Sequence, residues 1–383
     1  MRCLGLMSGT SADGVDAVLA EFHGSSHRPQ WSLIRHRHSP YSAQLQEQIV
    51  AAGQAESFPA ETWLDLAEAI TEAQADAATS CDPERTAQLV GCHGQTIWHR
   101  PRSQKRRGAS WQLLQAPLLA HLLARPVVHD FRAADLALGG QGAPLVPRAD
   151  AALLGSIGGW RGMLNLGGIA NITLIPPRCG PDRKAPIRGW DCGPANSLID
   201  LAVCRFSDGR HRFDRDGAMA KAGTCREDCI ETWLRHPYFQ KIPPKSTGRE
   251  LFGTADLERR LQDLGDCLPC DVIATLTGFT AALIAQDLEQ VQQQDGIRPL
   301  ELLVAGGGRR NPALMKQLRQ RCHGVAVSSS DDLGLPAEAR EALVFALLAW
   351  WHHQNHPANA PAITGAEHEA VLGVHVKPSQ WVG

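Results

Sequence analysis

The amino-acid sequence predicts an α/β fold divided into two domains. The chain has 383 residues, of which 43% are hydrophobic and 20% charged. At about 100–200 residues per domain, this length fits two domains, each with a buried core of its own. Along the whole chain, short apolar runs of strand length alternate with longer helical patterns, which is typical of α/β proteins.

The N-terminal part of the chain supplies strands and one clear helix. Strands are expected at Cys3–Met7 and Val15–Phe22, joined by the polar turn Ser8–Gly14. Apolar residues recur on one face of a helix expected over Glu61–Thr79. Two further short strands are expected, Leu89–Cys92 and Val127–His129.

The second half of the chain repeats this organisation. Two strands are expected within Met163–Ile175, on either side of the pair Gly167-Gly168. A long helix over Ile273–Gln294 is followed by a buried-type strand, Leu300–Ala305, which runs directly into Gly306–Gly308. An apolar helix, Ala337–Trp351, closes the pattern.

Charge and composition argue against several classes of protein. Lys and Arg number 38 against 40 Asp and Glu, a net charge of −2, whereas a nucleic-acid binder usually carries a basic excess. The basic cluster Arg100–Arg107 is expected to be a solvated loop. The N-terminus has no apolar segment of the signal-peptide kind, and Leu113–Val128 is interrupted by charge and proline, so no membrane segment is expected. Eleven scattered cysteines without a secretory pattern predict reduced thiols and a cytoplasmic localisation.

Three glycine-bearing turns follow expected strands, at Ser8–Gly14, Gly167-Gly168 and Gly306–Gly308. Glycine allows a backbone to approach a ligand closely and to direct N–H groups at anionic oxygens. A single such turn simply permits a tight hairpin, but three of them in both halves of the chain favour a bound nucleotide. Neither a P-loop nor a dinucleotide-binding glycine motif is present in the sequence.

Carboxylates lie next to these turns. Asp13 and Asp16 follow the first turn, where an aspartate can hold Mg²⁺ beside phosphates or, before Gly14, simply shape the turn. Asp191 lies in Trp190–Asn196, expected as a loop before a helix, where it can serve as a general base or cap the helix. Both interpretations remain open for each residue.

Four cysteines could in principle form a further site. Cys225 and Cys229, together with Cys267 and Cys270, have spacings related to those of a structural zinc site or a redox dithiol. The acidic surroundings of the first pair and the long gap to the second pair disfavour zinc. The lack of a thioredoxin-like βαβ pattern before Cys267 and Cys270 disfavours a redox dithiol.

The motifs, taken together, resemble one family. Gly5–Asp16 is similar to the N-terminal signature of the anhydro-N-acetylmuramic acid kinases. Similar segments follow in order across roughly residues 3–350: His93–Thr96 with His99–Pro101, Asp130–Asp135, Gly139–Pro147, Asn165–Asn171, Pro244–Glu250, Gly306–Asn311, and Glu341-Ala342 with Phe345-Ala346. The chain departs from the family at Cys192 and Ala195, where the catalytic loop commonly has Thr and Gly, and Cys192 lacks a hydroxyl that could touch the nucleotide or the base.

The resemblance implies a fold and an activity. The fold is a two-domain actin/hexokinase-like (RNase H-like) fold with an interdomain nucleotide cleft, expected as residues 1–130 plus 335–383 and residues 131–334. The activity is that of an ATP- and Mg²⁺-dependent kinase acting on 1,6-anhydro-N-acetylmuramic acid. It opens the anhydro ring with water and phosphorylates O6, giving N-acetylmuramic acid 6-phosphate and ADP during peptidoglycan recycling. Family precedent also implies a homodimer.

The resemblance assigns site residues as well. It implies that Asp191 is the catalytic base and that Asp13 contacts Mg²⁺ held with ATP. The ATP-binding residues are expected to be Gly9, Thr10, Ser11, Ala12, Asp13, Gly14, Val15, Asp16, Gly167, Gly168, Asn171, Gly306, Gly307, Gly308 and Asn311. The sugar is expected to meet His93, Gln95, Thr96, Arg132 and Glu341. A related kinase for another amino sugar and a non-catalytic ATP-binding switch remain as alternatives.

Overall fold

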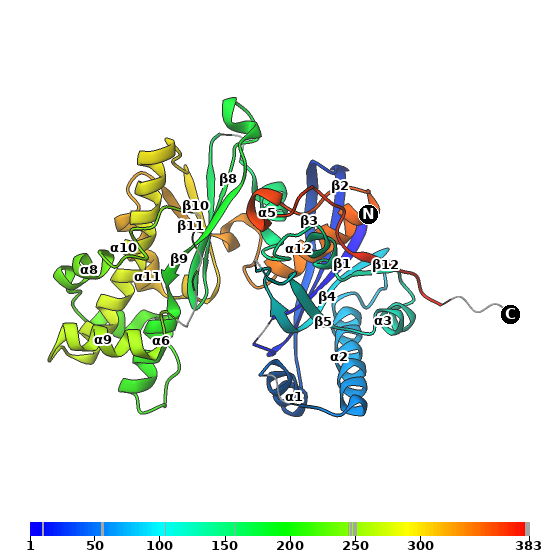
Figure 1. Cartoon of the computed structure of the whole chain (residues 1–383), viewed down its shortest axis with the longest axis horizontal. Coiled ribbons are helices and arrows are strands. Elements are labelled where there is room, and N and C mark those ends of the chain that lie inside the picture. Colours follow the sequence, from blue (N-terminus) through cyan, green and yellow to red (C-terminus); the bar gives the residue numbers. More distant parts are fainter. Residues whose placement is uncertain are drawn as a thin grey trace. The chain divides into compact units, whose positions relative to one another are not determined.

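The computed structural model describes residues 1–9, 11–54, 57–103, 105–156, 158–243, 245, 247 and 251–379. The chain divides into two compact units, unit 1 (Met1–Leu154 with Gly334–Gly383) and unit 2 (Gly155–Leu333), which are shown in Figure 1. The first boundary lies later than the expected one after residue 130. Residues 131–154 belong with unit 1 because their polar groups are satisfied there: Thr364 Oγ1 donates to Asp135 at 2.7 Å, and Arg340 Nε donates to Asp150 at 3.0 Å.

Unit 1 is built on one large sheet. Its elements are β1 (Arg2–Ser8), β2 (Gly14–Ser25), β3 (Arg28–Pro40), α1 (Ala43–Gly53), α2 (Ala60–Cys81), β4 (Leu89–Arg100), β5 (Ala109–Leu113), α3 (Ala116–Leu123), β6 (Val127–His129), α4 (Ala133–Ala137), α5 (Val146–Leu154), α12 (Arg340–His353), α13 (Pro361–Thr364) and β12 (Val374–Val376). The seven-stranded sheet has the order β12-β6-β4-β1-β2-β3, and β5 pairs with β4. β1 runs antiparallel to β2 and parallel to β4, and β4 runs parallel to β6.

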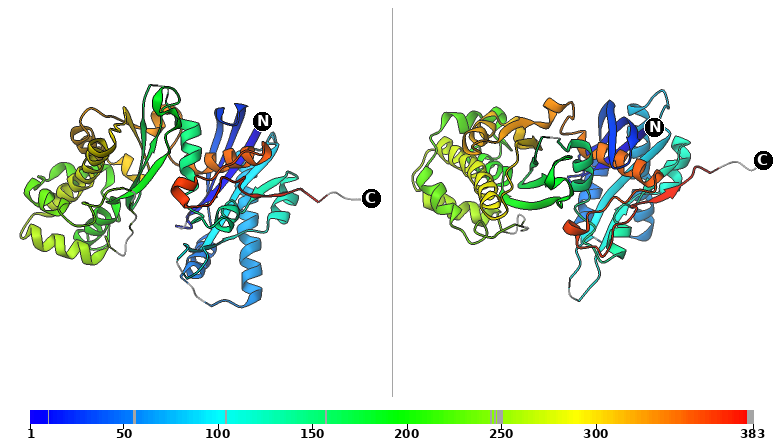
Figure 2. Two further views of the ribbon diagram at one scale, coloured as in Figure 1. Left: turned by 45° about the horizontal axis from the view of Figure 1, so that its top comes forward. Right: turned by 90° about the horizontal axis from the view of Figure 1, so that it is seen from above.

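Glycines on one face of this sheet seat α12. A Cβ at Gly5 of β1 would lie 1.9 Å from the carbonyl oxygen of Ala342, and a Cβ at Gly91 of β4 would lie 2.1 Å from that of Phe345. Only glycine therefore lets the backbone of α12 lie so close to the central strands. Because side chains alternate along a strand, neighbouring Leu4 and Val90 face the opposite side, in the cluster that includes residues of α2. Figure 2 shows α12 in orange, lying against the blue strands.

Unit 2 has a smaller sheet with several helices around it. Its elements are β7 (Arg161–Leu166), β8 (Ile169–Ile175), the 3₁₀ turn η1 (Pro181–Lys184), β9 (Arg188–Pro194), α6 (Asn196–Phe206), η2 (Arg215–Gly217), α7 (Ala218–Ala222), α8 (Glu227–Leu234), α9 (Thr254–Leu264), α10 (Pro269–Asp295), β10 (Glu301–Ala305), η3 (Gly307–Arg310), α11 (Pro312–Arg321), β11 (Ala326–Ser329) and η4 (Ser330–Leu333). The sheet order is β11-β10-β7-β8-β9.

Both units contain the same five-strand arrangement. In unit 2, β7, β8 and β9 form an antiparallel meander, and β10 and β11 continue the sheet parallel to β7. In unit 1, β1, β2, β3, β4 and β6 take the corresponding places in the same directions. This duplicated order, third-second-first-fourth-fifth, is the RNase H-like topology expected of an actin/hexokinase-like protein, so the predicted fold class is confirmed.

The long helix α10 forms the core of unit 2. In the part of the chain that the structure describes, it is the one helix whose length and composition would allow it to cross a membrane, but 78% of its most apolar window is buried. Its apolar residues, including Phe279 and Ile284, belong to the main hydrophobic cluster of unit 2. It starts at Pro269, four residues before the expected start, since proline at the first helical position costs no hydrogen bond.

Five strands, β3, β5, β9, β11 and β12, were not expected from the sequence, and two of them bear on the site. β3 was not expected, because its arginines and histidines hide the strand pattern; it pairs only with β2, and charged residues are common on such edge strands. The segment around Asp191, expected as a loop, is instead strand β9, paired with β8 from Arg188 to Pro194.

Candidate active site

The first glycine-bearing turn joins β1 to β2 in unit 1. Ala12 closes it, since its N–H donates to the carbonyl oxygen of Gly9 at 3.2 Å, with Ala12 buried at a φ of +51°. Ser11 Oγ donates to Asp13 Oδ1 at 2.9 Å, and both residues are exposed. The turn therefore presents a carboxylate and a hydroxyl to solvent. Thr10, expected to bind ATP, lies outside the described residues.

Gln95 supports this turn from β4. Its side chain is fully buried, its Nε2 donates to the carbonyl oxygen of Gly9 at 3.0 Å, and its Oε1 accepts from Tyr41 Oη at 3.5 Å. The amide is therefore occupied by the protein itself. These bonds hold the phosphate-loop candidate in place, and the expected contact of Gln95 with the sugar stays a prediction.

The end of the turn leads to a carboxylate held by two histidines. Val15 is fully buried, and Asp16, the next residue, is partly exposed. Asp16 Oδ1 lies 3.1 Å from His36 Nε2 and 3.1 Å from His38 Nδ1, both on the neighbouring strand β3. Gly14 passes so close to β3 that a Cβ would lie 2.4 Å from the carbonyl oxygen of Ser39.

His93 and Arg132 form a directed pair. His93 Nδ1 donates to the carbonyl oxygen of Gly94 at 2.8 Å, so Nε2 is the acceptor for Arg132 Nη2 at 3.0 Å. Burial, reinforced by the charge of Arg132, lowers the pKa of His93 to about 3 and keeps the ring neutral. Arg132 Nη1 donates to the carbonyl oxygen of Gly142 at 2.7 Å, which fixes the guanidinium in orientation.

Glu341 lies in the first turn of α12, in the same electrostatic environment. Loss of water around its carboxylate raises the pKa of Glu341, and the negative charges of Asp150 and Asp16 raise it further. The positive charges of Arg340 and Arg132 act in the opposite direction. The side chain still reaches solvent. Thr96, the remaining expected sugar contact, is partly exposed, and its Oγ1 accepts from the side chain of Gln112 at 3.1 Å.

Three polar residues form a row across the sheet of unit 2. Asn165 of β7 pairs with Asn171 of β8, and Asn171 pairs with Asp191 of β9, so all three side chains share one face. All three are partly exposed. The sequence-based prediction included Asn171 and Asp191 but missed Asn165, and only the strand register shows that the three lie side by side.

The backbone around Asp191 is firmly held. Its N–H donates to the carbonyl oxygen of Lys245 at 2.9 Å, its carbonyl oxygen accepts from Tyr238 Oη at 2.7 Å, and its Oδ2 accepts from the N–H of Thr247 at 3.1 Å. Lys245 and Thr247 belong to the motif Pro244–Glu250, whose other residues lie outside the described part of the chain. Ala195 occupies the N-cap position of α6, and its own side chain makes no cap hydrogen bond.

The family departures Cys192 and Ala195 are both fully buried. The Cys192 thiol donates a hydrogen bond to the Asp287 carboxylate in the core. The Cys192 side chain thus lies in the core of unit 2, and an effect of its missing hydroxyl on the nucleotide or base stays a prediction.

The other glycine-bearing turns are close to α6 and to each other. The carbonyl oxygens of Gly167 and Gly168 accept the N–H groups of Asn196 and Ser197 at 3.1 Å each, so this turn caps α6. Gly306, with a φ of +79°, passes so close to β7 that a Cβ would lie 2.6 Å from Asn165 Oδ1. This is a turn that requires glycine.

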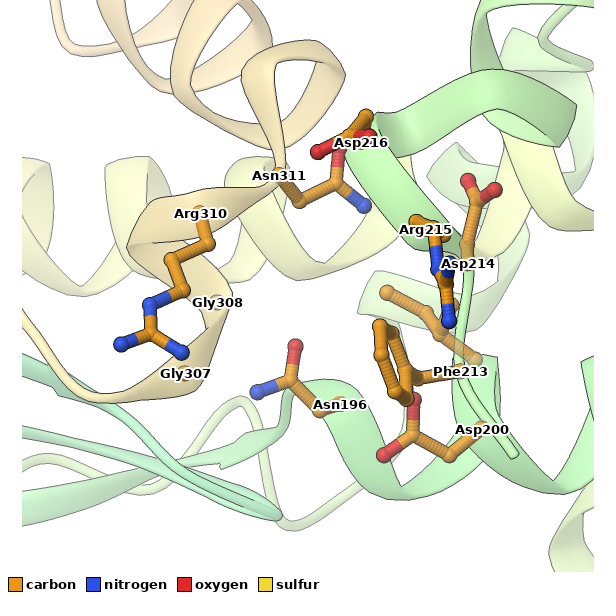
Figure 3. A pocket seen from close by; sticks show the side chains of 11 residues that line it. Asn196, Asp200, Phe213, Asp214, Arg215, Asp216, Gly307, Gly308, Arg310 and Asn311 are labelled. Carbon is orange, nitrogen blue, oxygen red and sulfur yellow. The ribbon is translucent and has the colours of Figure 1, made fainter. Parts of the chain in front are cut away.

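A pocket of about 550 Å³ opens beside the third turn and lies wholly within unit 2. This volume is within the usual range for small-molecule sites. Figure 3 shows Gly307–Asn311 along one side and Phe213–Asp216 along the other, with α6 at a third side. The lining residues are Asn196, Ile199, Asp200, Phe213, Asp214, Arg215, Asp216, Gly307, Gly308, Arg310 and Asn311.

Three predicted ATP-binding residues, Gly307, Gly308 and Asn311, line this pocket. Asn311 also caps α11, where its side chain accepts from the N–H groups of Ala313 and Leu314. The prediction missed Phe213, whose ring is 54% exposed. An exposed phenylalanine in a polar stretch, Arg210–Asp216, was the available signal.

Among the described residues, no group of three or more His, Cys, Asp or Glu side chains is arranged to hold a metal. The zinc interpretation of the four cysteines therefore has no support in the described part of the chain.

A duplicated RNase H-like fold with glycine turns, carboxylates beside them and a pocket of about 550 Å³ places the chain among the actin/hexokinase-like proteins, a class that includes sugar kinases. Comparison with known proteins specifies the family: residues 1–378 match the family model "Anhydro-N-acetylmuramic acid kinase". The chain belongs to this family.

Relatives with high sequence identity carry the same family name. It is 72% identical over 379 residues to the anhydro-N-acetylmuramic acid kinase of Synechococcus sp. (strain CC9902) and 68% identical to that of Parasynechococcus marenigrum (strain WH8102), covering 99% of this chain and 100% of each relative. A solved structure, a ROK family glucokinase from Streptomyces griseus in complex with glucose and AMPPNP, is similar with a TM-score of 0.37 and 14% identity over 91% of this chain and 99% of that chain. The family model and the relatives show that the protein is a kinase of peptidoglycan recycling.

Proposed function

We propose that this kinase opens the 1,6-anhydro bridge of 1,6-anhydro-N-acetylmuramic acid with water while transferring the γ-phosphoryl group of ATP to O6. The water oxygen bonds to C1, the bond between C1 and O6 breaks, and O6 takes the phosphoryl group. The water proton passes to a carboxylate. The products are N-acetylmuramic acid 6-phosphate and ADP.

Asp191 is the proposed base, and its fixed placement is the observation that carries the proposal. Its N–H, carbonyl oxygen and Oδ2 are all hydrogen-bonded to neighbouring segments, so the carboxylate keeps one orientation at a partly exposed position. Opening a glycosidic bond needs a carboxylate that activates water. Ordinary glycosidases also need an acid to protonate the leaving oxygen, but here phosphorylation can take over that role.

Each unit, taken by itself, contains residues proposed to bind ATP. The turn Gly9–Asp16 and the glycines Gly167, Gly168 and Gly306 would approach the phosphates. The pocket lined by Gly307, Gly308, Asn311 and Phe213 would take the adenosine end. An exposed aromatic ring at a pocket of this size supports stacking of a base.

The residues present also fit Mg²⁺ carried with ATP. Asp13 is exposed and Asp16 partly exposed, and Mg²⁺ bound to phosphates commonly needs only one or two carboxylates because it keeps several waters. Asp13 is the proposed ligand. When bound, Mg²⁺ offsets the negative charge of the phosphoryl group in transfer.

Sugar binding is proposed to involve Glu341, Arg132 and Thr96. Arg132 is oriented by the neutral ring of His93, and a cation held in this way can bind an anionic group such as the lactyl carboxylate of a muramic acid. Glu341 can accept hydrogen bonds from sugar hydroxyls. His93 and Gln95 would act through Arg132 and the turn at Gly9.

The test is product analysis by mass spectrometry in ¹⁸O-labelled water with Mg·ATP and the anhydro sugar. We expect a product that carries one phosphoryl group and one labelled oxygen. Phosphorylation without label would instead indicate an ordinary kinase that uses a free hydroxyl. No turnover with ATP bound would favour another sugar or a non-catalytic switch.

Asp191→Asn tests the base directly. We expect turnover to fall by at least about 100-fold, the lower end of what a general base contributes, while ATP binding is retained. Asp295→Asn, which removes a carboxylate paired with Arg188 at the surface of the same unit, is the matched control. An active Asp191→Asn enzyme would remove Asp191 from this role.

Two further properties are proposed on family precedent and composition: a cytoplasmic localisation and a homodimer. Small molecules, and neither nucleic acid nor membrane, are the proposed partners. Sedimentation of the purified protein measures the oligomeric state.

A further inference from the structure

A buried ion pair lies directly behind Asp191. Lys245 Nζ is 2.5 Å from Asp287 Oδ1, and each side chain is only 2% exposed. Asp287 belongs to α10, in the apolar core of unit 2. Two buried charges are costly to desolvate, and a well-packed apolar pair is often as stable or more so. Net stability is therefore a poor explanation for this pair.

Asp287 contacts both neighbours of Asp191 on β9. Trp190 Nε1 donates to Asp287 Oδ2 at 2.8 Å in the buried core, and the Cys192 thiol shares a hydrogen bond with the same carboxylate. Trp190 and Cys192 both belong to the main hydrophobic cluster of unit 2, whereas Asp191 is partly exposed, and the pairing of β9 with β8 is bulged at Cys192. One carboxylate thus fixes the strand on both sides of the proposed base.

Lys245 completes the arrangement from the opposite direction. Its carbonyl oxygen accepts the N–H of Asp191, and Thr247, two residues further on, donates its N–H to Asp191 Oδ2. The Lys245 ammonium also lies 5.3 Å from the ring centroid of Tyr238, whose hydroxyl donates to the Asp191 carbonyl oxygen. The segment that hydrogen-bonds to the carboxylate is therefore anchored by the same ion pair that holds β9.

We propose that Asp287, through its ion pair with Lys245, is a positioning residue for Asp191. This inference rests on the proposed role of Asp191 as the base. The ion pair holds β9 in place relative to Lys245 and Thr247, and thereby sets the direction of the Asp191 carboxylate. Neither Asp287 nor Lys245 touches substrate in this account.

The test compares Asp287→Asn with a matched buried pair in the same unit. Asp256→Asn breaks the ion pair to Arg260 within α9, whose side chains are 1% and 2% exposed. Both variants leave a buried cation without its anion, so both are expected to lower stability. Only Asp287→Asn is expected to lower kcat by about 10- to 100-fold at a temperature where each variant is fully folded, with the Kd for an ATP analogue unchanged.

The outcomes separate the two proposals. An equal kcat in Asp287→Asn and Asp256→Asn, while Asp191→Asn is inactive, would overturn the positioning role alone. An active Asp191→Asn enzyme would overturn the base assignment itself. If Asp287→Asn does not fold, Trp190→Phe removes one hydrogen bond to Asp287 and keeps the aromatic ring; a kcat loss of about tenfold supports positioning, and an unchanged kcat contradicts it.

Discussion

At the scale of single residues, the structure shows the partners of two side chains that the sequence could only associate with the site. Gln95 supports the first turn, and Cys192 lies in the core. Residue types and order identify the site region, because motifs carry both. They do not identify which way a side chain points, because that depends on strand register and on partners far along the chain.

His93 and Arg132 give a prediction at this scale. His93→Phe removes the acceptor at 3.0 Å from Arg132 Nη2, so that of the two hydrogen bonds described above only the one to Gly142 still orients the guanidinium. We expect kcat/KM for the sugar to fall by about 10- to 100-fold, the effect of removing a supporting partner of a site residue, with KM for ATP unchanged. Steady-state kinetics with each substrate varied in turn measures kcat/KM for the sugar and KM for ATP separately.

His93→Gln, which keeps an acceptor oxygen, should retain more activity than His93→Phe. His121→Gln, at an exposed position of α3, serves as the control for a histidine remote from the site. Because the pKa of His93 is about 3, the ring is neutral at neutral pH. If sugar binding by the wild-type enzyme changed with pH near neutrality, and this change disappeared in the His93 variants, a neutral His93 would be contradicted.

At the scale of elements, α12 depends on the glycines beneath it. A Cβ at Gly5 would meet the backbone of Ala342 at 1.9 Å, and Ala342 directly follows Glu341. We predict that Gly5→Ala pushes α12 away from β1 and lowers the free energy of unfolding by at least about 1–3 kcal/mol, the usual cost of overpacking. Chemical denaturation measures the loss, and the KM for the sugar should rise with it.

Gly53→Ala is the matched control in the same unit. The nearest atom to its added Cβ is 3.9 Å away, and Gly53 ends the helix α1. Alanine is a better helix former than glycine, so stability should stay level or rise by less than about 1 kcal/mol. Equal effects of Gly5→Ala and Gly53→Ala would show that α12 is not seated by close approach to β1.

Element types followed from the sequence where periodicity was strong. The two strand–turn–strand units, the long helix α10 and the closing helix α12 were predicted, because their apolar patterns are long and uninterrupted. β3 was not, because an edge strand keeps charged residues on its open side. β9 was not, because Gly193 and Pro194 resemble a loop, although pairing with β8 holds them in a strand.

At the scale of the whole molecule, the two units share a topology but differ in how many of their histidines have a lowered pKa. Unit 1 contains several histidines whose pKa is lowered by burial, to about 3 for His93 and to about 4 for His356. The pKa is lowered for three more, His99, His129 and His375. Among the described residues of unit 2, His236 alone has a lowered pKa.

These directions predict that unit 1 loses more stability than unit 2 as the pH falls from 7 to 5. A histidine with a lowered pKa in the folded state takes up protons mainly on unfolding below pH 6.5, so stability falls with pH in this window. His93 alone would contribute about 2 kcal/mol between pH 6.5 and 5. Asp150 and Glu341, whose pKa values are raised, act in the opposite direction but are fewer.

Hydrogen–deuterium exchange of peptides from each unit, corrected for the intrinsic pH dependence of exchange, measures this difference. Protection should fall with acidification in the core strands of unit 1, β1 and β4, before it falls in β7 and β10 of unit 2. His356→Gln removes one of the titrating rings at a position outside the proposed site, where it packs against Trp351, and should reduce the acid sensitivity of unit 1 alone. Equal loss of protection in both units would mean that the buried histidines do not control acid stability. In that case the shared topology, which gives both units the same strand order around different side chains, would govern the response instead.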